Sequence, residues 1–208
     1  MITNIEQLDI EQRYTYADYL TWQFNERVEL LWGKIFKMSP APSTEHQRIS
    51  GNLYRDIANF VKFSKCQVFH APFDVRLTSK DNKLESVVQP DIVVVCDESK
   101  LDDKGCIGAP DLIIEILSPY SARKDMKYKL HLYEESGVPE YWVVDPLDGL
   151  IQVFSIDNNK YQLNRPYTCE DRVSSFVING LTINLQEIFP NLLKESEELY
   201  GENVKRIY

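Results

Sequence analysis

Two segments of the chain repeat their apolar residues with the period of a helix. In residues 43–63 (STEHQRISGNLYRDIANFVKF), one face carries Ile49, Leu53, Ile57 and Phe60. This spacing predicts an amphipathic helix, and Thr44 and Gln47 stand at capping-box spacing at its start. Residues 121–136 repeat the pattern just before a Gly-Val-Pro sequence, and glycine followed by proline is typical of a helix end.

Four other segments have the length and composition of strands. Residues 67–77, 87–96 and 111–118 are apolar and are separated by polar turns, and EYWVVD follows the second helix at 140–145. The predicted order of the core is therefore αβββαβ. We expect an α/β (or α+β) protein with a mixed central sheet flanked by helices.

The remaining segments extend this core on both sides. Residues 14–24 are predicted to be helical, and residues 28–38 are predicted to form a hairpin that turns near Trp32-Gly33. Because no repeat or flexible linker interrupts the chain, we expect one domain over residues 1–208. It would consist of an N-terminal elaboration (1–42), the core (43–146), and C-terminal strands and a tail (147–208).

Composition is typical of an ordinary globular protein. The 208 residues are 43% hydrophobic and 26% charged, which fits a single sizeable core. The four cysteines form no C-x-x-C pair, so we predict neither a disulfide framework nor a zinc site, and we expect a reducing, cytoplasmic environment. Neither a signal peptide nor a membrane span is predicted. The net charge of −9 argues against a uniformly basic surface, so any nucleic-acid site must be local.

Two carboxylates interrupt strands that are otherwise apolar. Glu115 lies within LIIEILS, and Asp91 follows Pro90 within VVQPDIVVVC. Burying a carboxylate is costly unless a cation compensates it, and two neighbouring carboxylates raise each other's pKa. Oxygen ligands of this kind suit Mg²⁺ or Mn²⁺. The alternatives are that Asp91 bonds turn amides and that Glu115 is paired with Lys129 or an arginine.

The second predicted helix carries two further charges on its apolar face. A helical wheel of residues 121–136 places Asp125 and Lys129 on the arc that should face the sheet. They could form a simple i,i+4 ion pair at the edge of that face. Next to a metal bound by Asp91 and Glu115, however, the lysine would complete the minimum set for phosphodiester hydrolysis.

These residues resemble the PD-(D/E)-x-K nuclease superfamily, and more narrowly the Uma2 family of restriction-endonuclease-like proteins. The stretches that carry the resemblance are VELLWGKIFKMSPAPSTEHQRISGNL, VVQPDIVVV and GAPDLIIEILSPYSARKDMKYKLHLYEESGVPEYWVVDP. The resemblance implies a restriction-endonuclease-like fold and a Mg²⁺-dependent DNA endonuclease. The chain departs from the superfamily pattern at Leu117, where a lysine is usual. The resemblance suggests that this lysine has moved to the following helix, where the wheel points to Lys129.

The resemblance also implies a role for each residue at the site. Asp91 and Glu115 would be metal ligands, joined by the Ile116 backbone carbonyl. Lys129 would be the catalytic cation, and Asp125 would orient it or a water network. The resemblance assigns no role to Asp111, which is expected to be a turn residue at the start of its strand.

Two residues near the first helix remain open. His46 lies on the apolar face of that helix, where it is either a hydrogen-bonded residue at the edge of the core or, as the resemblance suggests, part of the site together with Glu45 as a water-mediated ligand. Glu29 falls in the family-like stretch, but hairpin alternation alone could place it on a solvent face.

DNA is the expected partner, and Arg123, Lys124 and Lys127 are the nearest basic residues in sequence. Tyr133, Tyr141 and Trp142 are expected in the core. A homodimer is predicted, with the hairpin 28–38 or the tail 194–208 as its interface. Alternative functions are an inactive nucleic-acid-binding or oligomeric scaffold and a hydrolase of a smaller phosphate ester.

Overall fold

The computed structural model of the chain describes residues 2–38, 41–78 and 84–192, in which two six-stranded mixed sheets lie against a few helices. The predicted tail interface at 194–208 lies outside the described residues. The first sheet has, in spatial order, β2 (Lys34–Lys37), β1 (Val28–Leu31), β5 (Leu84–Val88), β4 (Val75–Thr78), β8 (Gly105–Ile107) and β7 (Leu101–Asp102). The second has β12 (Lys160–Leu163), β11 (Leu150–Asp157), β10 (Glu140–Asp145), β9 (Leu112–Ile116), β6 (Ile92–Val95) and β3 (Gln67–His70).

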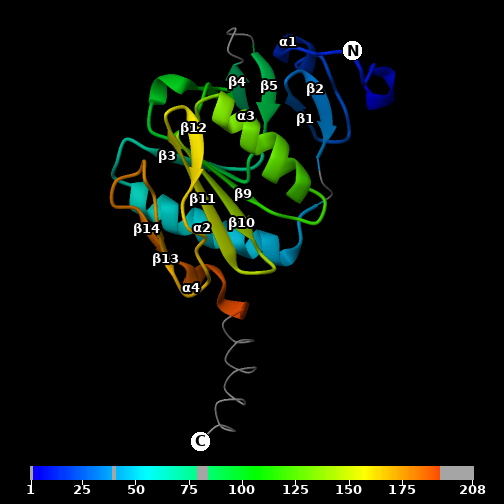
Figure 1. Ribbon diagram of the computed structural model, residues 1–208. Helices are drawn as coiled ribbons and strands as arrows, with labels where there is room; N and C mark the ends of the chain where they lie inside the picture. The colour runs from blue at the N-terminus through cyan, green and yellow to red at the C-terminus, as the bar shows by residue number, and fades with distance from the viewer. Residues whose placement is uncertain (1, 39–40, 79–83, 193–208) are drawn as a thin grey trace, which may run out of the picture.

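Helices cover the second sheet on both sides (Figure 1). The two long helical segments are α2 (Thr44–Val61) and a segment that begins as a π-helix (Lys124–Lys129) and continues as α3 (Leu130–Glu135). The smaller elements are the 3₁₀ turns Ile5–Gln7 and Glu98–Lys100, α1 (Tyr16–Tyr19), the β13 (Arg172–Ser174) and β14 (Thr182–Asn184) hairpin, and α4 (Leu185–Ile188).

The prediction that residues 67–77 and 87–96 each form one strand of a single central sheet is wrong. The segments 67–77 and 87–96 each divide into two strands, and the halves belong to different sheets: β3 and β6 join β9, while β4 and β5 join β1. Each break contains a proline, Pro72 or Pro90, which has no N–H to donate to a sheet ladder. The chain therefore crosses between the sheets at these points.

The helix boundaries also differ in part from the predicted ones. The cap of α2 is Ser43, whose side chain accepts a hydrogen bond from the His46 backbone N–H, so the predicted capping box at Thr44 is wrong by one residue. The predicted helix 14–24 shortens to α1, where Thr15 and Asp18 form a capping box instead. The hairpin turns at Trp32-Gly33 as predicted.

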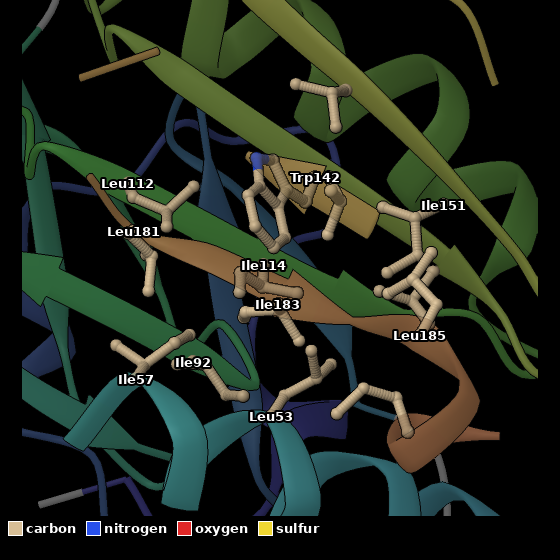
Figure 2. Close-up of a cluster of buried hydrophobic side chains, with 14 of the residues drawn as sticks. Leu53, Ile57, Ile92, Leu112, Ile114, Trp142, Ile151, Leu181, Ile183 and Leu185 are labelled. Atoms are coloured by element: carbon tan, nitrogen blue, oxygen red, sulfur yellow. The ribbon is translucent and has the colours of Figure 1, made fainter. Parts of the chain in front are cut away.

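Side chains alternate between the two faces of the second sheet, and each face packs against different elements. Ile114 and Trp142 point toward α2 and pack with Leu53, as Figure 2 shows. Ile113 and Tyr141 belong to the opposite face, which packs against α3 and the first sheet. Tyr133, Tyr141 and Trp142 are fully buried, which confirms that they are core residues. Because Glu115 lies between Ile114 and Ile116 in β9, it shares the α3 face.

The prediction that the cysteines form no disulfide is wrong, because Cys66 and Cys96 are bonded to each other. The residues next to them, Gln67 and Val95, are paired in the antiparallel β3–β6 ladder, which brings the two cysteines opposite each other. The two cysteines are 30 residues apart in sequence, and this separation alone does not indicate a contact that depends on strand pairing. The cysteine pattern therefore no longer supports a reducing environment.

None of the helices within residues 2–38, 41–78 and 84–192 combines the length and the apolar character that a membrane span requires.

Candidate active site

One cavity of about 620 Å³ brings the predicted residues together. It lies where the first turn of α2, the loop that follows β9 and the π-helical turn meet. Its lining includes Asp91, Glu115, Ile116, Asp125, Lys129, His46 and Glu45.

Asp91 sits at the crossing between the two sheets, directly before β6. Its Oδ2 accepts a hydrogen bond from the backbone N–H of Ile116 at 2.8 Å and lies 3.4 Å from Nε2 of His46. The carboxylate thus ties the start of β6 to the end of β9. The side chain remains 21% exposed, which leaves it accessible from the cavity.

Glu115 is held on the buried face of β9. Its Oε1 accepts hydrogen bonds from Nζ of Lys129 and from the hydroxyl of Tyr133, both at 2.7 Å. Burial raises the pKa of this carboxyl to about 8, because the nearby charge of Lys129 only partly offsets the lost hydration and the carboxylates of Asp125 and Asp91 oppose ionisation. The positive charge near Glu115 is therefore too small to keep its carboxyl ionised at neutral pH.

Lys129 is surrounded by three carboxylates. Its Nζ lies 2.7 Å from Glu115, 2.8 Å from Glu29 and 3.6 Å from Asp125. Burial disfavours the ammonium, but these three carboxylates outweigh burial and raise the pKa of Lys129 well above its ordinary value. Lys129 is therefore protonated at neutral pH.

Glu29 is part of this cluster, although the hairpin pattern allowed a solvent position for it. The side chain is fully buried, with Lys124 Nζ at 2.6 Å from one oxygen and Lys129 Nζ at 2.8 Å from the other. The backbone N–H of Gln89 also donates to it. Burial alone would raise the pKa of Glu29, but Lys129 and Lys124 prevail and lower it to about 2.

The sequence held a signal for Glu29 that was not used. All four residues of β1 are buried, and Glu29 interrupts the apolar run VELLW as Glu115 interrupts LIIEILS. The signal was not used because a hairpin was expected to expose one of its faces to solvent. In the structure β1 is an interior strand of its sheet, between β2 and β5.

Asp125 lies on the π-helical turn, a local form of helix that is frequent at functional sites. Burial raises the pKa of its carboxyl, and Lys129 opposes that effect. Among the described residues, Oδ1 of Asp125 is buried and has no hydrogen-bond partner. The Lys129 ammonium, 3.6 Å away, is beyond hydrogen-bond distance, so in the part of the chain that the structure describes this buried oxygen lacks a hydrogen-bond donor although a cation is near.

His46 and Glu45 contact the site in different ways. His46 is close to Asp91, which outweighs the effect of burial and raises the pKa of the imidazole. Within the described chain, its Nδ1 is buried without a hydrogen-bond partner. Glu45 lies at the rim, where its Oε2 pairs with Arg48 and accepts a hydrogen bond from Asn191 at 3.2 Å.

The remaining candidate residues differ in whether they face the cluster or the solvent. Asp111 accepts a hydrogen bond from the Cys96 backbone N–H at 2.7 Å and does not line the cavity. Lys124 points inward to Glu29, whereas Arg123 and Lys127 are exposed. Only the last two remain available to an external anion.

The charge balance of the cluster tests whether a divalent cation fits. It contains four carboxylates and two ammonium groups: Glu29, Asp91, Glu115, Asp125, Lys124 and Lys129. With all four carboxylates ionised and His46 neutral, two negative charges would remain uncompensated; the raised pKa of Glu115 means that a proton offsets part of this excess at neutral pH. In the described residues, the hydrogen bonds to Asp91 and Glu115 use only Oδ2 and Oε1, which leaves a second oxygen on each.

No group of three or more His, Cys, Asp or Glu side chains within residues 2–38, 41–78 and 84–192 is arranged to hold a metal ion. Zinc, which usually takes four protein ligands or three plus water, does not fit such a site. Mg²⁺ does, because it is commonly bound by one or two carboxylates and keeps waters or substrate phosphate as its other ligands.

Comparisons with known proteins place the chain in a family. The Uma2 family, described as "Putative restriction endonuclease", matches residues 16–186. An "Uncharacterized protein" of Synechocystis sp. is 25% identical over 178 residues, which cover 84% of this chain and 90% of the relative.

A solved structure shares the fold. The crystal structure described as a "putative nuclease belonging to DUF820" from Anabaena variabilis superposes with a TM-score of 0.65 and covers 85% of this chain and 98% of its own. At 21% identity this likeness concerns the fold alone. Because the family match spans most of the sequence, the chain belongs to the Uma2 family of nuclease-like proteins.

Proposed function

We propose that the protein is a Mg²⁺- or Mn²⁺-dependent DNA endonuclease with a restriction-endonuclease-like core. The observation that carries this proposal is the convergence of Asp91, Glu115 and Lys129 on one cavity, in a cluster with more carboxylates than ammonium groups. A divalent cation would replace the proton on Glu115 and compensate the ionised carboxylates. The cation and the Lys129 ammonium would then bind the negatively charged phosphodiester.

Within this proposal, α2, the crossing strands, β9, the helix with its π turn, and β10 correspond to the αβββαβ core. Glu115 is held within β9, and Asp91 lies directly before β6, where the Ile116 N–H of β9 holds its carboxylate. β9 is an interior strand of the second sheet, and the residue directly before β6 lies where the chain passes from one sheet to the other.

Asp91, Glu115 and the Ile116 carbonyl would hold the metal ion. When bound, the ion would polarise a phosphoryl oxygen and lower the pKa of a water molecule. Lys129 keeps its proton on Nζ and would stabilise the charge that develops on the phosphoryl oxygens. Glu29 and Asp125 hold that ammonium in place, and the Tyr133 hydroxyl fixes Oε1 of Glu115.

The two Pro-Asp sequences of the chain supply a matched test. Asp91 and Asp111 both follow proline, and each accepts one backbone N–H of a neighbouring strand, at 2.8 and 2.7 Å. Only Asp91 lines the cavity. Asp91→Asn and Asp111→Asn therefore make the same chemical change at similar structural positions.

The assay is cleavage of supercoiled and single-stranded DNA by the purified protein with Mg²⁺, Mn²⁺ or EDTA. We expect metal-dependent cleavage by the parent and by Asp111→Asn, and none by Asp91→Asn. Absence of cleavage by the parent on every substrate would remove the proposed activity, and retained DNA binding in that case would favour the scaffold alternative. Cleavage that survives Asp91→Asn would indicate a contaminating nuclease.

A homodimer, with the hairpin 28–38 as part of its interface, is proposed for the active form. In the described chain, β2 is an edge strand of its sheet and can pair with another chain. Size-exclusion chromatography with light scattering measures the mass directly, and a monomer at working concentration would contradict the dimer.

A further inference from the structure

A second hollow of about 410 Å³ opens beside the candidate active site. We call it the aromatic–basic groove, and its lining is Phe36, Lys37, Met38, Tyr120, Arg123, Lys124 and Tyr128. Met38, Tyr120 and Lys124 also line the active-site cavity, so the two spaces are continuous. A ligand in the cavity can therefore extend into the groove.

The groove has an unusual composition for a protein of net charge −9. Its lining contains three basic residues, three aromatic residues and a methionine, and no carboxylate. Lys124 is already paired with Glu29, but among the described residues no carboxylate oxygen lies within 4.0 Å of the charged groups of Lys37 or Arg123. These two exposed cations are therefore available to an external anion.

The aromatic residues line the groove together with those cations. Tyr120 is 77% exposed and lines both hollows, so its ring is open to a ligand. Phe36 and Tyr128 line the groove as a tilted pair, with ring centroids 5.8 Å apart at 44°. Aromatic rings beside cations are the combination that binds single-stranded nucleic acid, because bases stack on the rings while phosphates pair with the cations.

We propose that the aromatic–basic groove binds an unpaired nucleotide adjacent to the cleaved phosphodiester, with its base stacked on Tyr120 and its phosphate held by Arg123 and Lys37. The preferred substrate is then DNA with a single-stranded segment beside the scissile bond. This inference rests on the proposed function, because it specifies the form of DNA that the same site takes. An acidic polypeptide is disfavoured as the occupant, because it would use the cations and leave Tyr120 without a stacking partner.

The test measures binding separately from cleavage. A fluorescent single-stranded oligonucleotide is titrated with protein in EDTA and followed by anisotropy at several salt concentrations. The variants are Arg123→Ala and Tyr120→Ala. Their matched controls are Lys62→Ala and Phe63→Ala, an exposed cation and a 93% exposed ring at the opposite end of α2. That end lies roughly 25 Å from the cavity, at 1.5 Å per helical residue.

Arg123→Ala should reduce the salt slope of log K by about 0.7, which corresponds to a roughly fivefold loss of affinity at 0.1 M salt. Tyr120→Ala should weaken binding by about 5- to 150-fold, as expected for loss of one stacked base. That loss should disappear on an oligonucleotide with abasic sites throughout, because no base remains to stack. Both control variants should bind as the parent does.

Three results would overturn the inference: no binding of the oligonucleotide by the parent, equal affinities of groove and control variants, or competition by polyglutamate as strong as competition by DNA with no effect of Tyr120→Ala. Binding that depends on the groove in a protein that cleaves nothing would leave the groove assignment standing and refute only the proposed nuclease activity. The two failures are therefore distinguishable.

Discussion

Glu29 and Glu115 offer the sharpest test of the electrostatics in the cluster, since both are buried and both contact the same ammonium. Their distances to Lys129 Nζ are 2.8 and 2.7 Å. Their pKa values nevertheless move in opposite directions, because Glu29 faces two lysines whereas Glu115 faces one lysine and several carboxylates. Glu29→Gln and Glu115→Gln should therefore change stability with opposite signs.

The magnitude for Glu29 follows from its pKa. Lowering it from 4.5 to about 2 corresponds to about 3 kcal/mol of stability at neutral pH. Loss of one partner of a buried ion pair costs a similar ~3–5 kcal/mol. For a urea m-value of about 2 kcal/mol/M, the Glu29→Gln midpoint should fall by roughly 1.5–2.5 M. Glu115→Gln should leave the midpoint unchanged or raise it, because a carboxyl with a pKa of about 8 must take up a proton on folding at neutral pH, whereas glutamine is already neutral.

Urea unfolding in EDTA, followed by fluorescence and circular dichroism from pH 2 to 8, measures both effects. The stabilisation by Glu29 should be complete above pH 4.5 and should be lost as the pH falls toward 2, since protonation removes the charge that Lys124 and Lys129 bind. The gap between parent and Glu29→Gln should close over that interval. An unchanged midpoint for Glu29→Gln at pH 7, or a drop for Glu115→Gln as large as that for Glu29→Gln, would refute this account.

Three further predictions concern catalysis, metal binding and the disulfide. Lys129→Met keeps the buried stem and deletes the charge, so DNA cleavage should fall by about 10²–10³-fold with little change in DNA or metal affinity, measured by single-turnover kinetics and titration; an undiminished rate would exclude a transition-state role. Mg²⁺ at 100 times its Kd should stabilise the parent by about 2.7 kcal/mol in thermal unfolding, and Asp91→Asn should abolish the shift; equal shifts in both proteins would place the ion elsewhere. Thiol titration of the denatured, unreduced chain should find two free thiols, Cys106 and Cys169, and Cys66→Ser with Cys96→Ser should lower stability by roughly 3–4 kcal/mol for a loop of this length; four free thiols would contradict the bond.

The sequence was informative wherever a charge interrupted an apolar pattern. Asp91, Glu115, Asp125 and Lys129 stood out against strongly apolar surroundings, and all four line one cavity. Glu29 did not stand out, because a hairpin can expose one face and only the complete sheet shows that β1 is covered on both. Burial of an interior strand is a property of the assembled sheets, which local periodicity does not contain.

Strand pairing was the least predictable part of the fold. The apolar segment 87–96 reads as one strand, and only the missing N–H of Pro90 indicated a break. Which sheet each half joins depends on residues as distant as Leu30, the partner of Val87. The opposition of Cys66 and Cys96 follows from the same long-range pairing and was missed for the same reason.

The spread of the cluster along the chain has a consequence for biosynthesis. Glu29 and Lys129 are separated by 100 residues, and their contact requires the first sheet to lie against the helix that follows β9. Contacts of such separation form late, because the long loop must close before they stabilise anything. Before Lys129 has left the ribosome during synthesis, the acidic residues of the cluster would be hydrated and far from one another. The ammonium group that they surround in the folded protein would still be missing. Under the proposed function, an unfinished copy of the protein would therefore be unable to cut the DNA of its own cell.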